Sequence, residues 1–103
     1  MLTSEAVLTE VFHLLARARV TADAAWNLLG TGGVVMASMT QDELPDVREI
    51  MRQYGDRPMD FADATLVHLA RRERLDVVFT LDDDDFETYR IRGRQRFRIL
   101  PGR

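Results

Sequence analysis

Helix-like and strand-like segments alternate along the whole chain, with no internal repeat, low-complexity stretch or long linker between them. Amphipathic spacing predicts helices, whereas short β-branched apolar runs predict buried strands. Helices that alternate with short apolar strands form a parallel sheet that is covered by helices on both faces. A chain of 103 residues suits one such unit. We therefore expect a single α/β domain over residues 1–103.

The expected elements follow from apolar spacing and from capping residues. We predict helices over Ser4–Ala18, Thr21–Leu29, a stretch that starts at Thr40, and Asp60–Arg74, and strands over Val34–Met39, Asp76–Leu81 and Phe97–Leu100. Thr40 and Glu43 have the spacing of a capping box at the start of the third helix. In parallel sheets, functional sites collect at the C-terminal ends of the strands. Polar residues that directly follow a strand are therefore the first candidates for a site.

Composition and charge exclude several classes of protein. No apolar run approaches the roughly 20 residues of a membrane helix, and the first residues lack the pattern of a secretory signal. We therefore expect a cytoplasmic protein without a membrane partner. The chain has no cysteine, which excludes disulfide scaffolds, thiolate zinc sites and cysteine nucleophiles. His13 and His68 match no zinc-ligand spacing, and we expect both at the surface.

Two helical carboxylates occupy positions where apolar side chains are expected. Asp63 falls inside the apolar stripe of its predicted helix. A buried carboxylate there is costly unless it is paired or binds a cation. Asp63 could equally be the third-position acid of a capping box begun by Asp60. Glu10 lies at the edge of the stripe of the first helix, where it could also pair with Arg17.

A run of four aspartates, residues 82–85, is the third acidic feature. Acidic runs are usually solvated turns, but this run directly follows a predicted buried strand. Acidic groups from two helices and one strand end suit Mg²⁺ or Mn²⁺, which take oxygen ligands. Such a site favours phosphodiester hydrolysis, because a bound metal lowers the pKa of water and neutralises charge on the phosphate.

Three acidic segments follow one another along the chain: Glu5–Val11, Met59–Val67 and Val78–Phe86. In order and spacing they resemble the second, third and fourth acidic motifs of PIN-domain ribonucleases, including the VapC-type toxins of bacterial toxin–antitoxin modules. The resemblance implies a three-layer α/β/α sandwich around a parallel sheet, Mg²⁺ or Mn²⁺ as cofactor, and RNA as substrate. An antitoxin protein and a second copy of the chain are the partners it implies.

The resemblance also implies roles for individual side chains. It assigns metal binding and catalysis to Glu10, Asp63 and Asp82, with the metal activating water for in-line attack on an RNA phosphodiester. Asp60 and Asp85 are the neighbouring acids that could support or replace these ligands. The PIN domains that the chain resembles begin with a further strand, which ends in a catalytic Asp and is followed by helices, and the sequence holds no such segment before Glu10.

Three explanations of that difference are open: a start codon placed too far downstream, a fragment of a longer product, or a degenerate gene. The intact motifs favour the first. With one carboxylate fewer, we expect this form to be weakly active or inactive. The alternative function is a non-catalytic interaction module that binds an antitoxin or a second copy through an exposed sheet edge.

The C-terminal segment is basic, whereas the rest of the chain is acidic. Residues 1–89 carry a net charge of −9, while residues 90–103 contain six arginines and no acid. Arginines alternate with other residues from Arg90 to Arg98, which in one extended strand would place five of them on one side. Arg92, Arg94 and Arg96 are thus candidates to bind RNA phosphates. Equally, these arginines could pair with acids of this chain or of an antitoxin.

Overall fold

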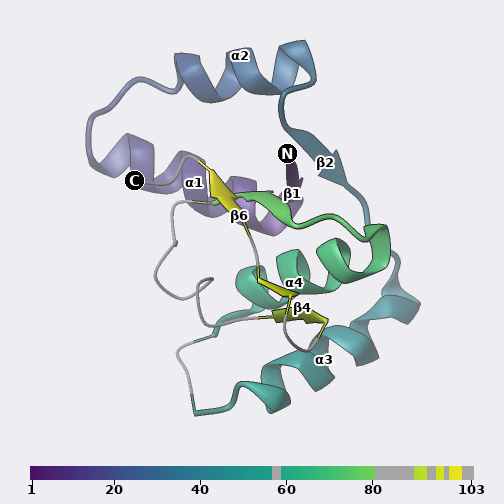
Figure 1. Cartoon of the computed structure of the whole chain (residues 1–103). Coiled ribbons are helices and arrows are strands. Elements are labelled where there is room, and N and C mark those ends of the chain that lie inside the picture. The colour runs from purple at the N-terminus through teal and green to yellow at the C-terminus, as the bar shows by residue number, and fades with distance from the viewer. Residues whose placement is uncertain (57–58, 81–89, 93–94, 97, 101–103) are drawn as a thin grey trace.

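The structure is a computed structural model that describes residues 1–56 and 59–80, and the backbone of residues 90–92, 95–96 and 98–100. Its elements are β1 (Leu2–Ser4), α1 (Glu5–Arg17), α2 (Asp23–Thr31), β2 (Val35–Ala37), the 3-10 turn η1 (Gln41–Glu43), α3 (Leu44–Gln53), α4 (Phe61–Glu73), β3 (Val77–Phe79), β4 (Arg90–Arg92), β5 (Gln95–Arg96) and β6 (Arg98–Leu100). Figure 1 shows α2 beyond one side of the main sheet and α4 and α3 beyond the other. The predicted α/β fold is confirmed.

The main sheet is parallel, as predicted, with the strand order β2-β1-β3-β6. The first strand, β1, lies inside the sheet, because Leu2 pairs with Val35 of β2 and with Val78 of β3. The hydroxyl of Thr3, which is buried, donates a hydrogen bond of 3.1 Å to the carbonyl oxygen of Phe79. The start of the chain is thus part of the core of the fold.

The predicted strand at residues 34–39 is present as β2, but the expectation that it is buried is wrong. Its Val35 and Met36 side chains are 57% and 49% exposed. The reason is position, because β2 ends the strand order and has a neighbour, β1, on one side only. An apolar run predicts a strand from its composition, but its place in the sheet decides whether that strand is covered.

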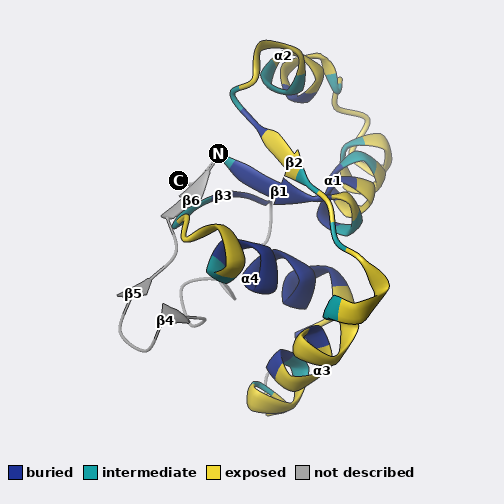
Figure 2. Cartoon of the chain, turned by 90° about the vertical axis from the view of Figure 1, so that its right-hand side faces the viewer, coloured by how far each residue is buried: buried dark blue, intermediate teal, exposed yellow. Residues whose placement is uncertain are grey.

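Helix α4 is buried along most of its length. Nine consecutive residues, Ala62–Ala70, are buried, and Figure 2 shows this helix in the buried colour between its neighbours. It packs against α3, α1 and β1, so that no side of its middle faces solvent. The predicted apolar stripe is therefore correct, but the burial extends to the polar side chains between its members.

The arginine-rich segment does not form one extended strand. Strands β4 and β5 pair antiparallel, with Arg90 opposite Arg96, and the next strand, β6, joins the main sheet beside β3. The condition under which five arginines would share one side, a single extended strand, is therefore not met, because the chain reverses between β4 and β5. No helix among the described residues is long and apolar enough to cross a membrane.

Candidate metal centre

The first turn of α4 is fixed by two carboxylates that cap each other's backbone. The side chain of Asp60 accepts a hydrogen bond of 2.9 Å from the backbone N–H of Asp63. In return, Oδ2 of Asp63 lies 3.4 Å from the backbone nitrogen of Asp60. The predicted capping box is therefore present. Asp63 is only 2% exposed, so its carboxylate lies in the interior at the positive end of the helix dipole.

Helix α1 brings a third carboxylate to the same place. It begins directly after β1, where Ser4 caps it by accepting a hydrogen bond of 3.1 Å from the backbone N–H of Val7. Helix α1 packs against α4, and one carboxylate oxygen each of Glu10, Asp60 and Asp63 lies within 4.8 Å of the others. We call these three residues the acidic cluster. The structure thus brings together Glu10 and Asp63, the two predicted ligands that it describes, and adds the predicted supporting acid Asp60.

The acidic cluster has the donors that a hard divalent cation requires. Mg²⁺ holds oxygen ligands at about 2.1 Å, so two ligands on opposite sides of one ion lie about 4.2 Å apart. The observed spread of up to 4.8 Å is close to that limit. A carboxylate accepts several hydrogen bonds through two oxygens, so capping and metal binding are compatible in the same side chain.

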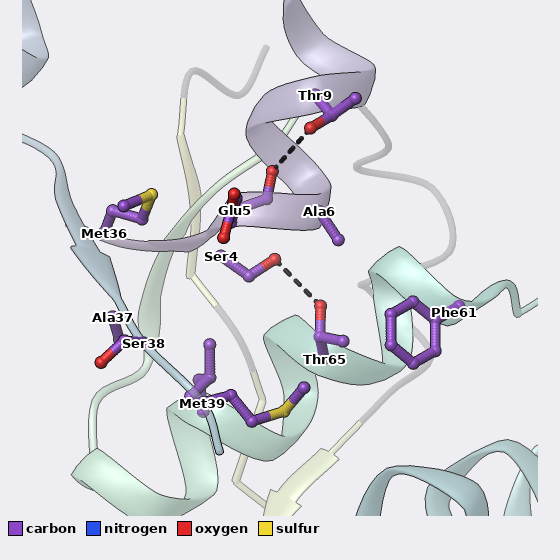
Figure 3. A pocket seen from close by; sticks show the side chains of 11 residues that line it. Ser4, Glu5, Ala6, Thr9, Met36, Ala37, Ser38, Met39, Phe61 and Thr65 are labelled. Carbon is purple, nitrogen blue, oxygen red and sulfur yellow. Dashed lines mark hydrogen bonds between the residues drawn. The ribbon is translucent and has the colours of Figure 1, made fainter. Parts of the chain in front are cut away.

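A cleft lies between α1, α4 and the ends of β1 and β2. Its volume is about 370 Å³, and its lining residues come from the end of β1, from β2 and the two residues after it, from α1 and from α4: Ser4, Glu5, Ala6, Thr9, Met36, Ala37, Ser38, Met39, Phe61, Thr65 and Leu69. The hydroxyls of Ser4 and Thr65 form a buried hydrogen bond of 2.9 Å (Figure 3). Glu10, Asp60 and Asp63 do not line this cleft, but two of its lining residues, Thr9 and Phe61, are the chain neighbours of Glu10 and Asp60.

A second polar group connects α4 to the segment after β2, and the sequence analysis missed it. His68 was expected at the surface, but it is buried, because the face of α4 that carries it is covered by α3 and η1. Its Nε2 lies 2.8 Å from Oε1 of Glu43. Since a carboxylate can only accept, this nitrogen carries the proton. Arg72 donates to the same Glu43 oxygen over 2.7 Å and to the backbone carbonyl of Ser38 over 2.9 Å.

These hydrogen bonds change the acidity of Glu43. The backbone N–H of Thr40, at 2.7 Å, is the main cause that lowers the pKa of Glu43 from 4.5 to about 2, with His68 and Arg72 adding to it. In turn, Glu43 raises the pKa of Arg72. The capping box at Thr40 and Glu43, which was predicted, was the available signal for this group. The capping box predicted that the Glu43 side chain is held by Thr40, but it did not predict the hydrogen bonds from His68 and Arg72 of α4.

The remaining predicted site residues lie in the C-terminal part of the chain. Asp82, Asp85 and Arg94 lie outside the described residues, which break off after Thr80 and resume only for the backbone of residues 90–92, 95–96 and 98–100. Arg92 belongs to β4 and Arg96 to β5, and only their backbone is described. Their predicted roles stay predictions.

Comparison with known proteins identifies the family of the chain. A sequence model of the PIN domain matches residues 1–91. Ribonuclease VapC26 from Mycobacterium tuberculosis (strain ATCC 25618 / H37Rv) is 33% identical over 87 residues, which cover 84% of this chain and 58% of the relative. The chain thus spans little more than half the length of this curated relative. Because the family match covers most of the residues, the chain belongs to the PIN domain family.

Proposed function

We propose that this chain is a metal-dependent endoribonuclease of the PIN type that acts as the toxin of a toxin–antitoxin module. The observation that carries the proposal is the acidic cluster, because it gathers oxygen donors from α1 and α4 into one place. The relative named as a ribonuclease supports RNA as the substrate class. Mg²⁺ and Mn²⁺ are the proposed cofactors, since both prefer carboxylate and water ligands.

The proposed residues divide into metal ligands, supporting acids and arginines that bind RNA. Glu10 and Asp63 hold the metal together with Asp82, while Asp60 and Asp85 support them. A bound divalent cation lowers the pKa of a coordinated water and neutralises the charge that builds up on the phosphate. Arg92, Arg94 and Arg96 attract the RNA backbone by neutralising its phosphates. We propose that the 103-residue form cleaves much more slowly than longer relatives.

The first test is calorimetric titration of Mn²⁺ into the wild-type chain and the Asp63→Asn variant. We expect saturable binding to the wild type and its loss in the variant, because an amide lacks the charge that the cation needs. Asp23→Asn is the matched control, since Asp23 is also a first-turn acid but belongs to α2. Unchanged binding in Asp63→Asn, or no binding to the folded wild type, would refute the proposed metal site.

A cleavage assay completes the test of function. Labelled single-stranded RNA is incubated with the chain and Mn²⁺, and then with the chain and EDTA. We expect slow cleavage that EDTA abolishes and that Asp63→Asn lacks. Cleavage that persists in EDTA would contradict a metal-dependent mechanism.

One observation favours the alternative function, a non-catalytic module that binds an antitoxin or a second copy. Strand β2 lies at the edge of the sheet with exposed apolar side chains, Val35 and Met36, and such edges pair with other chains. Light scattering on the wild type and on Met36→Lys tests it. A dimer that dissociates in Met36→Lys, combined with no Mn²⁺ binding, would favour the module over the enzyme.

A further inference from the structure

Phe61 is a large aromatic side chain that stays exposed beside the acidic cluster. It is the first residue of α4, directly after Asp60 and two residues before Asp63. Its exposed fraction is 48%, although the nine residues that follow it are all buried. The capping box uses the backbone and the side chains of Asp60 and Asp63, and so it does not require an aromatic side chain at this position.

The ring of Phe61 forms one rim of the cleft. Figure 3 shows it on one side of the opening, with Met36 and Ser38 on the opposite side and the hydrogen-bonded Ser4 and Thr65 between them. The cleft volume of about 370 Å³ lies within the range of small-molecule sites, about 300–1,000 Å³. A flat, mostly apolar group of this size would fit between the ring and the methionines.

The edge of the cleft is polar, which restricts the occupant further. Glu5 is exposed at its mouth, with its backbone carbonyl accepting a hydrogen bond of 3.0 Å from Thr9 (Figure 3). A carboxylate accepts hydrogen bonds and donates none when ionised. It therefore favours a flat group whose edge carries amino hydrogens, as adenine, cytosine and guanine do.

We propose that Phe61 and this cleft bind one base of a single-stranded RNA, stacked on the ring, beside the phosphodiester that the acidic cluster acts on. The inference rests on the proposed function and deepens it by naming the residue that holds the substrate's base. Proteins that bind unpaired RNA stack its bases on aromatic side chains. Because Phe61 directly follows Asp60 in the chain, a base on the ring would keep the adjoining backbone close to the cluster.

Fluorescence anisotropy of a short, unstructured, labelled RNA measures how much the Phe61 ring contributes to RNA affinity. Ca²⁺ serves as the cation, because it also takes oxygen ligands. We expect Phe61→Leu to weaken binding about 5- to 150-fold, the usual effect of losing one stacked base. Phe61→Tyr keeps the ring and should retain the affinity. Leu75→Ala is the control, because Leu75 is also a half-exposed apolar residue but follows the opposite end of α4.

RNAs that lack a single base locate the contact and keep the test independent of protein folding. One abasic position should weaken binding to the wild type as much as Phe61→Leu does, and should have no further effect on that variant. If no abasic position distinguishes the two proteins, or if the RNA does not bind, the inference is wrong.

The two proposals fail in different ways. Mn²⁺ binding and RNA cleavage that are unaffected by Phe61→Leu would overturn the base-stacking inference and leave the proposed function intact. If the abasic position weakens RNA binding to the wild type but not to Phe61→Leu, and the wild type binds no Mn²⁺, the metal site is wrong. RNA binding at the cleft would then still hold.

Discussion

Helices α4 and α2 represent the two extremes of packing in this molecule. In α4, nine consecutive residues are buried and the side chain of Asp60 caps the first turn. In α2, Ala25 is the buried residue and the N-cap residue, Ala22, makes no side-chain hydrogen bond, and Figure 2 shows the helix mostly in the exposed colour. The comparison shows that Asp63, the buried carboxylate of the acidic cluster, belongs to the best-packed helix. Groups held by packed elements keep their geometry better than groups on peripheral ones.

The largest expected effect comes from the interior of α4. Leu66 is fully buried, so Leu66→Ala removes apolar contacts and leaves a cavity. We expect a loss of about 2–5 kcal/mol in the free energy of unfolding. Urea denaturation measures it as a lower midpoint with an unchanged slope. A loss below that range would show that α4 can relax around the cavity and is less tightly packed than its burial indicates.

The matched change in α2 is Trp26→Ala. Trp26 is 61% exposed, and its ring lies against Phe12 with centroids 4.8 Å apart and planes tilted by 35°. We expect a loss of about 0.5–1.5 kcal/mol, the usual value of such an aromatic pair. If Trp26→Ala cost as much as Leu66→Ala in the same urea titration, the contrast between the two helices would be wrong.

The cap of α4 allows the structural and the metal-binding tasks of Asp60 to be separated. Asp60→Ala removes the hydrogen bond to the backbone N–H of Asp63 and should cost about 1 kcal/mol. Asp60→Asn keeps a good capping residue, so stability should stay nearly constant while Mn²⁺ affinity falls. Thermal unfolding and calorimetry on the two variants test this. Equal Mn²⁺ affinity in Asp60→Asn and the wild type would exclude Asp60 from the metal site.

The smallest effect is expected at the contact between α4 and η1. Because the pKa of Glu43 is lowered to about 2 in the folded chain, its ionised form stabilises the fold above pH 4.5. That contribution declines as the pH falls through the window from 4.5 to about 2. Glu43→Gln should therefore flatten the dependence of urea midpoints on pH in this window. An unchanged pH profile would mean that the hydrogen bonds that Glu43 accepts from Thr40, His68 and Arg72 do not stabilise the fold.

The sequence predicted the helices best where capping residues and apolar spacing agreed. Helix α4 begins one residue after the predicted Asp60, and α1 begins one residue after Ser4. The exposure of β2 could not be predicted, because the order of strands in a sheet is set by long-range pairing. The local pairing of β4 with β5 was missed for a different reason, because alternating arginines are also compatible with one continuous strand.

Apolar spacing along a helix predicts one buried face, and the residues of the candidate site could be predicted only as far as that assumption holds. Asp63 was identified because it interrupted an apolar stripe, and it does lie in the interior. His68 was misplaced because α4 is covered on several sides, a property of its neighbours that its own sequence does not encode. That Glu10 approaches Asp63 follows from the packing of α1 on α4, which spacing within each helix cannot reveal.

The capping box of α4 has a consequence for how related sequences are interpreted. The oxygens that close the first turn belong to the same carboxylates that are proposed to hold the metal. Selection for a stable fold alone would therefore preserve polar residues at positions 60 and 63, even in a copy that no longer cleaves RNA. Asparagine caps a helix as well as aspartate does. An aspartate that persists in relatives where asparagine would serve the fold equally well is thus the sign of retained chemistry.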